Sequence, residues 1–210
     1  MKKLILLLTI FLTGTGIYAQ ENISTLFIAM PDTLMLGLEA EQRVELTAYP
    51  DSAQITITNI LDDEVVRTAL TENYIALQTS EAGTAQLMQL PLVNNTSIIG
   101  IITTVCRKVC DSQIEFFSPE WQPLNQPDMF PALDKSLFLR KDVDTASEDY
   151  INAVASLDMT PIKLTFLPDE QAISAVYDVK GYLSADDYKL VEPFLVKEPK
   201  VFKWDKFSFK

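Results

Sequence analysis

Apolar and polar residues alternate between residues 53 and 117, in runs that recur at roughly ten-residue spacing between turn residues. Ile55 and Ile57 alternate with threonines, and the charged turn Asp62-Asp63-Glu64 separates them from the next run. A period of two places successive side chains on opposite faces of a strand, and short turns join antiparallel neighbours. The pattern predicts a meander of about six strands, over residues 55–60, 65–70, 74–79, 85–92, 98–106 and 113–117.

Helices and further strands flank this meander. Residues 21–50 are predicted to be helical, with a break at Met30-Pro31-Asp32. Thr145 with Glu148, and Ser184 with Asp187, form capping-box patterns that predict two short later helices. Strands are predicted over 162–167 and 172–179, and over 201–204 and 207–209 with a turn at Asp205-Lys206. The predicted fold class is therefore α+β, with mostly antiparallel sheet and N-terminal helices.

A proline-rich segment at residues 119–134 separates the two halves. Pro119, Pro123, Pro127 and Pro131 recur every four residues, which predicts extended, irregular chain. Residues 20–210 have the length of a single domain. The alternative organisation is two subdomains, 20–118 and 135–210, joined by this connection.

The first nineteen residues have the pattern of a signal peptide. Lys2 and Lys3 precede an apolar stretch of residues 4–12, and Ile17-Tyr18-Ala19 leads to a cleavage site. The stretch is shorter than the roughly 20 residues of a membrane span, and no later segment is predicted to cross a membrane. We therefore expect cleavage after Ala19 and a mature chain that is periplasmic, secreted or on the outer surface.

The composition excludes several classes of function. Without residues 1–19 the net charge moves from −12 to −14, because two lysines and no acidic residues are lost. An acidic chain repels nucleic acid and anionic membrane surfaces. The absence of histidine excludes Ser/His/Asp and Cys/His catalysis and imidazole metal sites. No catalytic residue, metal ligand or cofactor site is predicted, and only carboxylate chemistry remains open.

Lysines are concentrated at the C-terminal end of the chain. We expect a strand at the edge of a sheet, protected by its charges; the alternative is a docking patch for an acidic partner. The five lysines are Lys197, Lys200, Lys203, Lys206 and Lys210.

Cys106 and Cys110 are the only cysteines, and they flank a predicted turn between strands. Outside the cytoplasm such a pair is expected to oxidise to a disulfide that pins the hairpin. The short loop predicts a stabilisation of only about 2 kcal/mol. Redox activity and two free thiols are the alternatives. Three residues between strands, rather than two before a helix, disfavour an oxidoreductase.

Aromatic side chains offer one candidate ligand surface. Trp121, Phe130 and Trp204 are candidate ligand-facing residues that could stack on a sugar, and packing of sheet and loops is the alternative. Asp142 and Asp144 match the start of a calcium loop, but the third carboxylate and the glycine are missing. No pair of carboxylates can be assigned to a glycosidase site from the sequence.

Three segments resemble a known family. They are Met30-Pro31-Asp32, TVCRKVCDSQI with the following FFSPEWQPL, and LSADDYKLVEPFLVKEPKVFKW. Together they resemble a Bacteroidales-restricted family of secreted, periplasmic proteins known only as a domain of unknown function. The resemblance covers nearly the whole chain after residue 19. It implies export and one domain over that length, and it implies no activity and no catalytic residues. In that family a glycine usually follows Asn or Asp in the last turn, where this chain has Asp205-Lys206.

These observations favour a non-catalytic binding or envelope-accessory protein, whose partner is an unknown envelope protein or a glycan. Two alternatives stay open: a carboxylate-dependent hydrolase that acts on glycans, and a structural subunit of an envelope complex.

Overall fold

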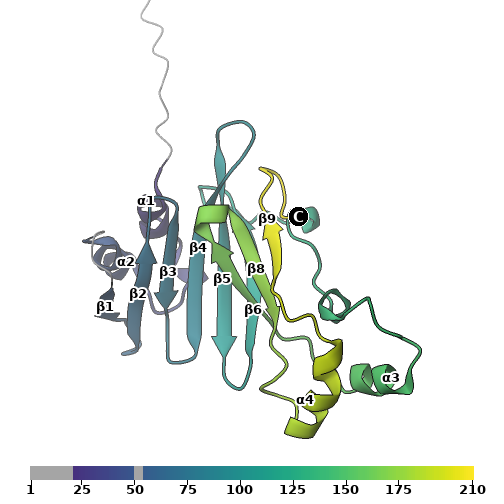
Figure 1. Cartoon of the computed structure of the whole chain (residues 1–210). Helices are drawn as coiled ribbons and strands as arrows, with labels where there is room; N and C mark the ends of the chain where they lie inside the picture. The colour runs from purple at the N-terminus through teal and green to yellow at the C-terminus, as the bar shows by residue number, and fades with distance from the viewer. Residues whose placement is uncertain (1–20, 50–53) are drawn as a thin grey trace, which may run out of the picture.

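The alternating segment forms a six-stranded antiparallel sheet whose strands follow sequence order (Figure 1). The computed structural model describes residues 21–49 and 54–210. The predicted meander is confirmed, with bounds that shift by a few residues. Its strands are β1 (Ile55–Thr58), β2 (Glu64–Leu70), β3 (Tyr74–Gln78), β4 (Gly83–Pro91), β5 (Ser97–Cys106) and β6 (Cys110–Phe117).

Two short helices cover one face of this sheet. They are α1 (Ile23–Ile28) and α2 (Ala40–Thr47), with a 3-10 turn, η1 (Asp32–Leu34), between them. Asn22 caps α1 by accepting a hydrogen bond from the backbone N–H of Thr25. The segment from 35 to 39 is not helical: η1 ends at Leu34, and Gly37 adopts a left-handed φ of 87°, which an α-helix does not contain. The helices pack on inward side chains of the sheet, among them Ile57, Val65, Ile75, Leu87 and Ile99.

A second, three-stranded antiparallel sheet packs on the opposite face. Its strands are β7 (Ile162–Leu167), β8 (Ala172–Tyr177) and β9 (Lys200–Lys203), in that order. β7 lies against β4, β5 and β6. Helices α3 (Glu148–Ala155) and α4 (Ala185–Val191) contact each other and lie beyond one end of the sheets (Figure 1). The remaining 3-10 turns are η2 (Pro127–Met129), η3 (Lys135–Phe138), η4 (Pro168–Glu170) and η5 (Glu192–Phe194).

The central strands are buried on both faces. In β3, Tyr74 and Ala76 point toward the second sheet, whereas Ile75 and Leu77 point toward the helices. In β4, Met88 likewise points toward the second sheet, and Leu87 points toward the helices. Successive apolar residues are therefore needed in β3, β4 and β5, while β1 and β6 keep alternating exposed positions.

The caps of the two later helices were predicted with mixed success. Ser184 accepts a hydrogen bond from the backbone N–H of Asp187, so the predicted start of α4 is confirmed. The predicted start at Thr145 is wrong, because Ser147 is the N-cap of α3 and accepts from the backbone N–H of Tyr150. Serine, threonine and aspartate all cap helices well, so closely spaced candidates compete.

The proline-rich connection passes around the β6 edge of the large sheet. Trp121 belongs to the core on the helical side, and Met129 belongs to the core under the second sheet. The connection is irregular as predicted, except for η2 and an isolated bridge between Phe117 and Pro123. The backbone N–H of Leu124 donates to the carbonyl of Phe116, so the connection blocks the C-terminal end of the β6 edge from pairing with another chain.

β9 is an edge strand, as the lysine pattern predicted. It pairs with β8 and has no further strand neighbour in the part of the chain that the structure describes. Lys200 and Lys203 lie on it. Charged residues on an edge disfavour pairing with another molecule.

Side chains of the large sheet hold the first strand of the small one. Three alternate backbone N–H groups of β7 donate to it: Ile162 to Asp111 Oδ1 at 3.1 Å, Leu164 to Ser112 Oγ at 2.9 Å, and Phe166 to Gln86 Oε1 at 3.0 Å. Gln86 Oε1 also accepts from the Tyr74 hydroxyl at 3.0 Å. The edge of β7 that does not pair with β8 thus has side-chain acceptors in place of a strand partner. These bonds fix the position of β7 along the large sheet.

We expect Tyr74 to make the fold sensitive to alkaline pH. Burial raises the pKa of Tyr74 from 10.0 to about 12, so the folded state holds this proton more tightly than the unfolded state. Its contribution to stability is complete below pH 10 and is lost as the pH rises toward 12. Tyr74→Phe should flatten the fall of the unfolding free energy across this range, measured by urea unfolding at several pH values.

The control for this prediction is Tyr49→Phe, because Tyr49 is 73 % exposed. Burial also raises the pKa of Tyr177, so part of the alkaline loss should persist in Tyr74→Phe. Equal slopes in Tyr74→Phe and Tyr49→Phe would contradict the assignment.

Candidate functional site

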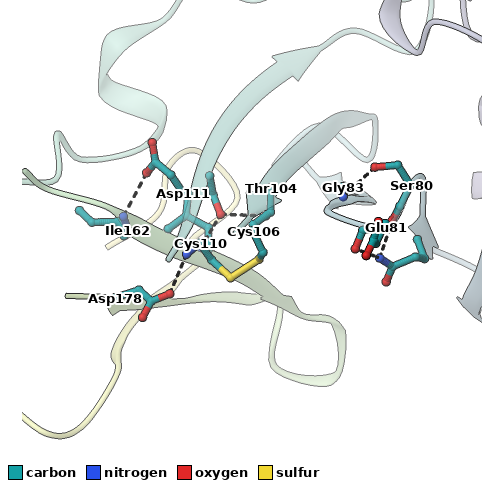
Figure 2. The surroundings of a disulfide bond; sticks show 12 residues. Ser80, Glu81, Gly83, Thr104, Cys106, Cys110, Asp111, Ile162 and Asp178 are labelled. Carbon is teal, nitrogen blue, oxygen red and sulfur yellow. Dashed lines mark hydrogen bonds between the residues drawn. A yellow bond between two sulfur atoms is a disulfide. The ribbon is translucent and has the colours of Figure 1, made fainter. Parts of the chain in front are cut away.

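The two cysteines form a disulfide at the turn between β5 and β6. The Sγ atoms of Cys106 and Cys110 are 2.07 Å apart, and the two residues face each other in the strand register (Figure 2). The backbone N–H of Cys110 donates to Asp178 Oδ2 at 2.7 Å. Asp178 follows β8, so the disulfide turn is tied to the second sheet as well as to its own hairpin.

Gly181 provides the close packing beneath this turn. A Cβ at Gly181 would lie 1.7 Å from the carbonyl oxygen of Lys108. Only glycine therefore lets the chain after β8 approach the backbone of the turn this closely. The turn between the cysteines is a docking element between the two sheets, and sequence spacing alone did not reveal it.

The two candidate tryptophans are packing residues in this structure. Trp121 and Trp204 are 6 % and 7 % exposed. The indole N–H of Trp121 donates to the carbonyl of Leu26 at 3.1 Å, and that of Trp204 to the carbonyl of Pro91 at 2.7 Å. Both indole N–H groups are hydrogen-bonded inside the protein. This agrees with the alternative in which the tryptophans pack sheet and loops.

The third candidate, Phe130, lines a surface groove. It is half-buried and packs edge-on against Phe202 and Phe209, with ring centroids 5.4 and 5.8 Å apart. The groove has a volume of about 430 Å³ and lies between β6 and the proline-rich connection. Phe116 and Leu124 also line it.

A larger and more apolar groove, here named the hairpin groove, forms where three distant segments meet. These are the β4–β5 connection, the proline-rich connection and the C-terminal turn, and the groove has a volume of about 540 Å³. Val93 and Phe207 stand on it with 77 % and 63 % of their surface exposed. The residues that line it are Leu92, Val93, Asn94, Thr96, Ser97, Ile98, Ser118, Pro119, Glu120, Leu124, Gln126, Met129, Lys206 and Phe207.

The hairpin groove was not predicted from the sequence. Residues 207–209 were expected to form a strand, but only an isolated bridge joins Phe209 to Trp204. Asp205 Oδ1 accepts from the backbone N–H groups of Phe207 and Ser208, and Lys206 has a φ of 71°. The aspartate and the left-handed lysine close the turn without a glycine, and the turn holds Phe207 outward.

A third groove, named the α4 groove, is lined by three carboxylates. It has a volume of about 320 Å³. Asp178, Glu192 and Glu198 line it together with Tyr188 and Lys180. Lys180 Nζ lies 5.5 Å from the centre of the Tyr188 ring. Burial and the neighbouring Glu192 raise the pKa of Tyr188. Asp178 is already bound to the Cys110 N–H, which leaves Glu192 and Glu198 as the carboxylates available for chemistry.

Two buried arginines that were not predicted as functional residues bind the ends of α1 and α2: Arg43, which lies on α2, and Arg67, which lies on β2. Arg43 is 2 % exposed and donates to the carbonyls of Ile28, Met30 and Leu38 and to Asp32 Oδ1. It thereby satisfies the carbonyls that follow α1.

Arg67 is fully buried and does the same for the end of α2. Its guanidinium donates to the carbonyls of Leu46, Ala48 and Tyr49, and burial lowers its pKa. One feature of the sequence could have indicated a special role for both arginines: Arg43 and Arg67 are the only basic residues between 21 and 106.

The described part of the chain shows no sign of a metal centre or a membrane span. Within residues 21–49 and 54–210, no three His, Cys, Asp or Glu side chains are grouped so that they could hold a metal ion. Among the same residues, no helix combines the length and the apolar character that crossing a membrane requires.

Comparisons with known proteins place the chain beside proteins that are themselves uncharacterised. A family model described as "Protein of unknown function (DUF3256)" matches residues 15–209. The chain is also similar to the solved structure of a domain of an uncharacterized protein from Porphyromonas gingivalis W83. The two share 26 % sequence identity with a TM-score of 0.81, over 91 % of this chain and 99 % of that one. The search of curated proteins found no match.

Proposed function

This chain belongs to the DUF3256 family of proteins of unknown function, and we propose that it is an exported, non-catalytic binding or accessory protein of the cell envelope. Its ligand presents an apolar group to the hairpin groove. The observation that carries this proposal is the exposure of Val93 and Phe207 on a groove built by three segments. Single exposed apolar side chains are common, but adjoining ones that line one groove are typical of a binding surface.

The size and lining of the hairpin groove fit a binding role. A volume of about 540 Å³ lies within the range of small-molecule sites. Apolar side chains such as Ile98 and Met129 would contact the ligand, while Glu120 and Lys206 lie among the lining residues as polar groups that could orient it. We take residues 20–210 as one domain, because a single buried cluster contains Met88 of the large sheet and Phe166 of the small one.

Export is proposed on the leader pattern of residues 1–19, which lie outside the described residues. The Cys106–Cys110 disulfide supports it, since such bonds persist in oxidising compartments. Mass spectrometry of the protein from fractionated cells should show a chain that begins at Gln20 in the envelope or secreted fraction. A full-length chain in the cytoplasm would contradict export.

The binding proposal is tested with a neutral apolar fluorescent probe, N-phenyl-1-naphthylamine. The wild-type protein should enhance its fluorescence saturably, and the variant Val93→Asp/Phe207→Asp should lose this enhancement. The matched control is Val176→Asp/Val201→Asp, because these valines are 41 % and 45 % exposed on the small sheet. Equal loss in the two variants, or no saturable binding by the wild type, would refute the hairpin groove as the site.

The alternative of a carboxylate-dependent glycan hydrolase has its best location in the α4 groove. Glu192 and Glu198 line this groove beside a tyrosine whose pKa burial and Glu192 raise. Glycosidases need two carboxyl groups across a cleft. Turnover of a glycan panel that Glu192→Gln and Glu198→Gln each abolish would establish the hydrolase and overturn the non-catalytic proposal.

A further inference from the structure

The surface formed by the N-terminal half carries no exposed positive charge. Between residues 21 and 106 the sequence has eleven aspartates and glutamates, and its only basic residues are Arg43 and Arg67. Both arginines are buried, 2 % and 0 % exposed, and both donate to backbone carbonyls. Apart from the Arg43–Asp32 pair, the acidic side chains of this surface have no cation among residues 21–106 to compensate them.

An exposed aliphatic cluster lies on this surface. Leu36, Ile60 and Leu61 are 79 %, 54 % and 62 % exposed. The two segments that carry them touch, because the backbone N–H of Ile60 donates to the carbonyl of Gly37 at 3.1 Å. Leu61 also packs closely over Gly37, where a Cβ would lie 3.0 Å from its Cδ1. Three large aliphatic side chains are therefore presented together.

The turn that presents the aliphatic cluster is held in one conformation. Asn59 is 8 % exposed, and its side-chain oxygen accepts from the backbone N–H groups of Leu61 at 2.8 Å and Asp63 at 3.0 Å. The backbone N–H of Asn59 in turn donates to the carbonyl of Asp63 at 2.9 Å. A preorganised apolar cluster loses less entropy when a partner covers it than a mobile loop does.

Acidic side chains surround the aliphatic cluster along the chain. Asp62, Asp63 and Glu64 continue the turn, Glu39 follows Leu36 by three positions, and all four are exposed. Like charges disfavour a second copy of the same face and an anionic membrane surface. A segment that carries both basic and apolar side chains would pair with the acids and cover the cluster.

We propose that the aliphatic cluster of Leu36, Ile60 and Leu61, within its acidic surroundings, docks a basic amphipathic segment of a partner protein. The cluster supplies the apolar contact, and the acidic residues speed and orient the encounter. This site is separate from the hairpin groove, so either proposal can fail without the other.

The test uses a synthetic peptide of alternating lysine and leucine character, with a second peptide in which glutamine replaces every lysine. Binding of each to the full mature chain is measured by fluorescence anisotropy at low and high salt. The lysine peptide should bind, its affinity should fall as salt rises, and the glutamine peptide should bind weakly. Leu36→Ser/Ile60→Ser/Leu61→Ser removes the apolar contact and should weaken binding of the lysine peptide by about tenfold. This corresponds to about 1.4 kcal/mol of binding free energy.

Two controls separate this docking from general attraction to an acidic protein. The variant Val176→Ser/Leu190→Ser/Val201→Ser removes three other exposed aliphatic side chains and should bind the lysine peptide as the wild type does. The groove variant Val93→Asp/Phe207→Asp should also bind normally. Equal affinities of the cluster variant and the wild type would overturn the proposal. So would concentration-dependent self-association that the cluster variant abolishes in sedimentation experiments, because the occupant would then be a second copy.

Discussion

Arg43→Met should lower the free energy of unfolding by about 3–5 kcal/mol, since three buried carbonyls lose their donor and each unsatisfied acceptor costs about 1–3 kcal/mol. The substitution leaves the carbonyls of Ile28, Met30 and Leu38 without their donors in a site that is 2 % exposed. Buried acceptors without partners are costly because water cannot replace the lost hydrogen bonds. The measurement is urea unfolding followed by circular dichroism.

Arg140→Met is the matched control for this prediction. Arg140 also binds an aspartate, Asp142 at 2.7 Å, but its side chain is 44 % exposed and solvent competes for both groups. We expect little change in stability there. Asp32→Asn should likewise have a small effect, since the Asp32 side chain is 62 % exposed and the carbonyl partners of Arg43 remain. If Arg43→Met costs no more than Arg140→Met, the guanidinium does not hold α1 and α2 together.

Gly181→Ala should have the second large effect, a loss of roughly 3 kcal/mol, at the upper end of the usual cost of overpacking. The new Cβ would lie 1.7 Å from the Lys108 carbonyl oxygen and 3.0 Å from Val109 Cγ1. The nearest of these atoms is backbone within a turn that the disulfide closes, so the turn cannot adjust by a side-chain rotation. Thermal unfolding measures the loss of stability, and hydrogen exchange at the Cys110 amide reports whether its bond to Asp178 opens.

Gly83→Ala is the control for Gly181→Ala. A Cβ there would meet the hydroxyls of Thr79 and Ser80, each at 2.8 Å, and those side chains can rotate away. Its cost should be clearly smaller. An equal cost at both glycines would mean that the docking of the disulfide turn on the second sheet contributes little.

The strands were predictable because their signal is local. In β1, Ile55 and Ile57 alternate with threonines whose side chains point to solvent, and that alternation is visible in the sequence. The cap of α4 was equally local, since Ser184 and Asp187 lie three residues apart. Where two nearby residues could cap a helix, as Thr145 and Ser147 could for α3, the local pattern did not identify the observed cap, Ser147.

The grooves and the roles of single residues were not predictable in the same way. The hairpin groove brings Val93 and Phe207 together from positions more than a hundred residues apart in the chain. As a tryptophan in a loop, Trp121 could have stacked on a ligand. Only the position of α1 shows that its indole N–H donates to the carbonyl of Leu26. Pairings of this kind depend on which faces the helices and the second sheet cover.

The sequence by itself predicted the α+β class, the six-strand meander and the acidic character of the chain, and it favoured a Cys106–Cys110 disulfide, because alternation, turns, spacing and charge are all local properties. Only the tertiary structure decided that the disulfide turn also docks on the second sheet through Asp178 and Gly181. It also turned both arginines of the N-terminal half inward, where backbone carbonyls compensate them, and left Leu36, Ile60 and Leu61 outside among acids. Burial is a property of the whole packed chain, and it separates a structural side chain from one that is free to bind.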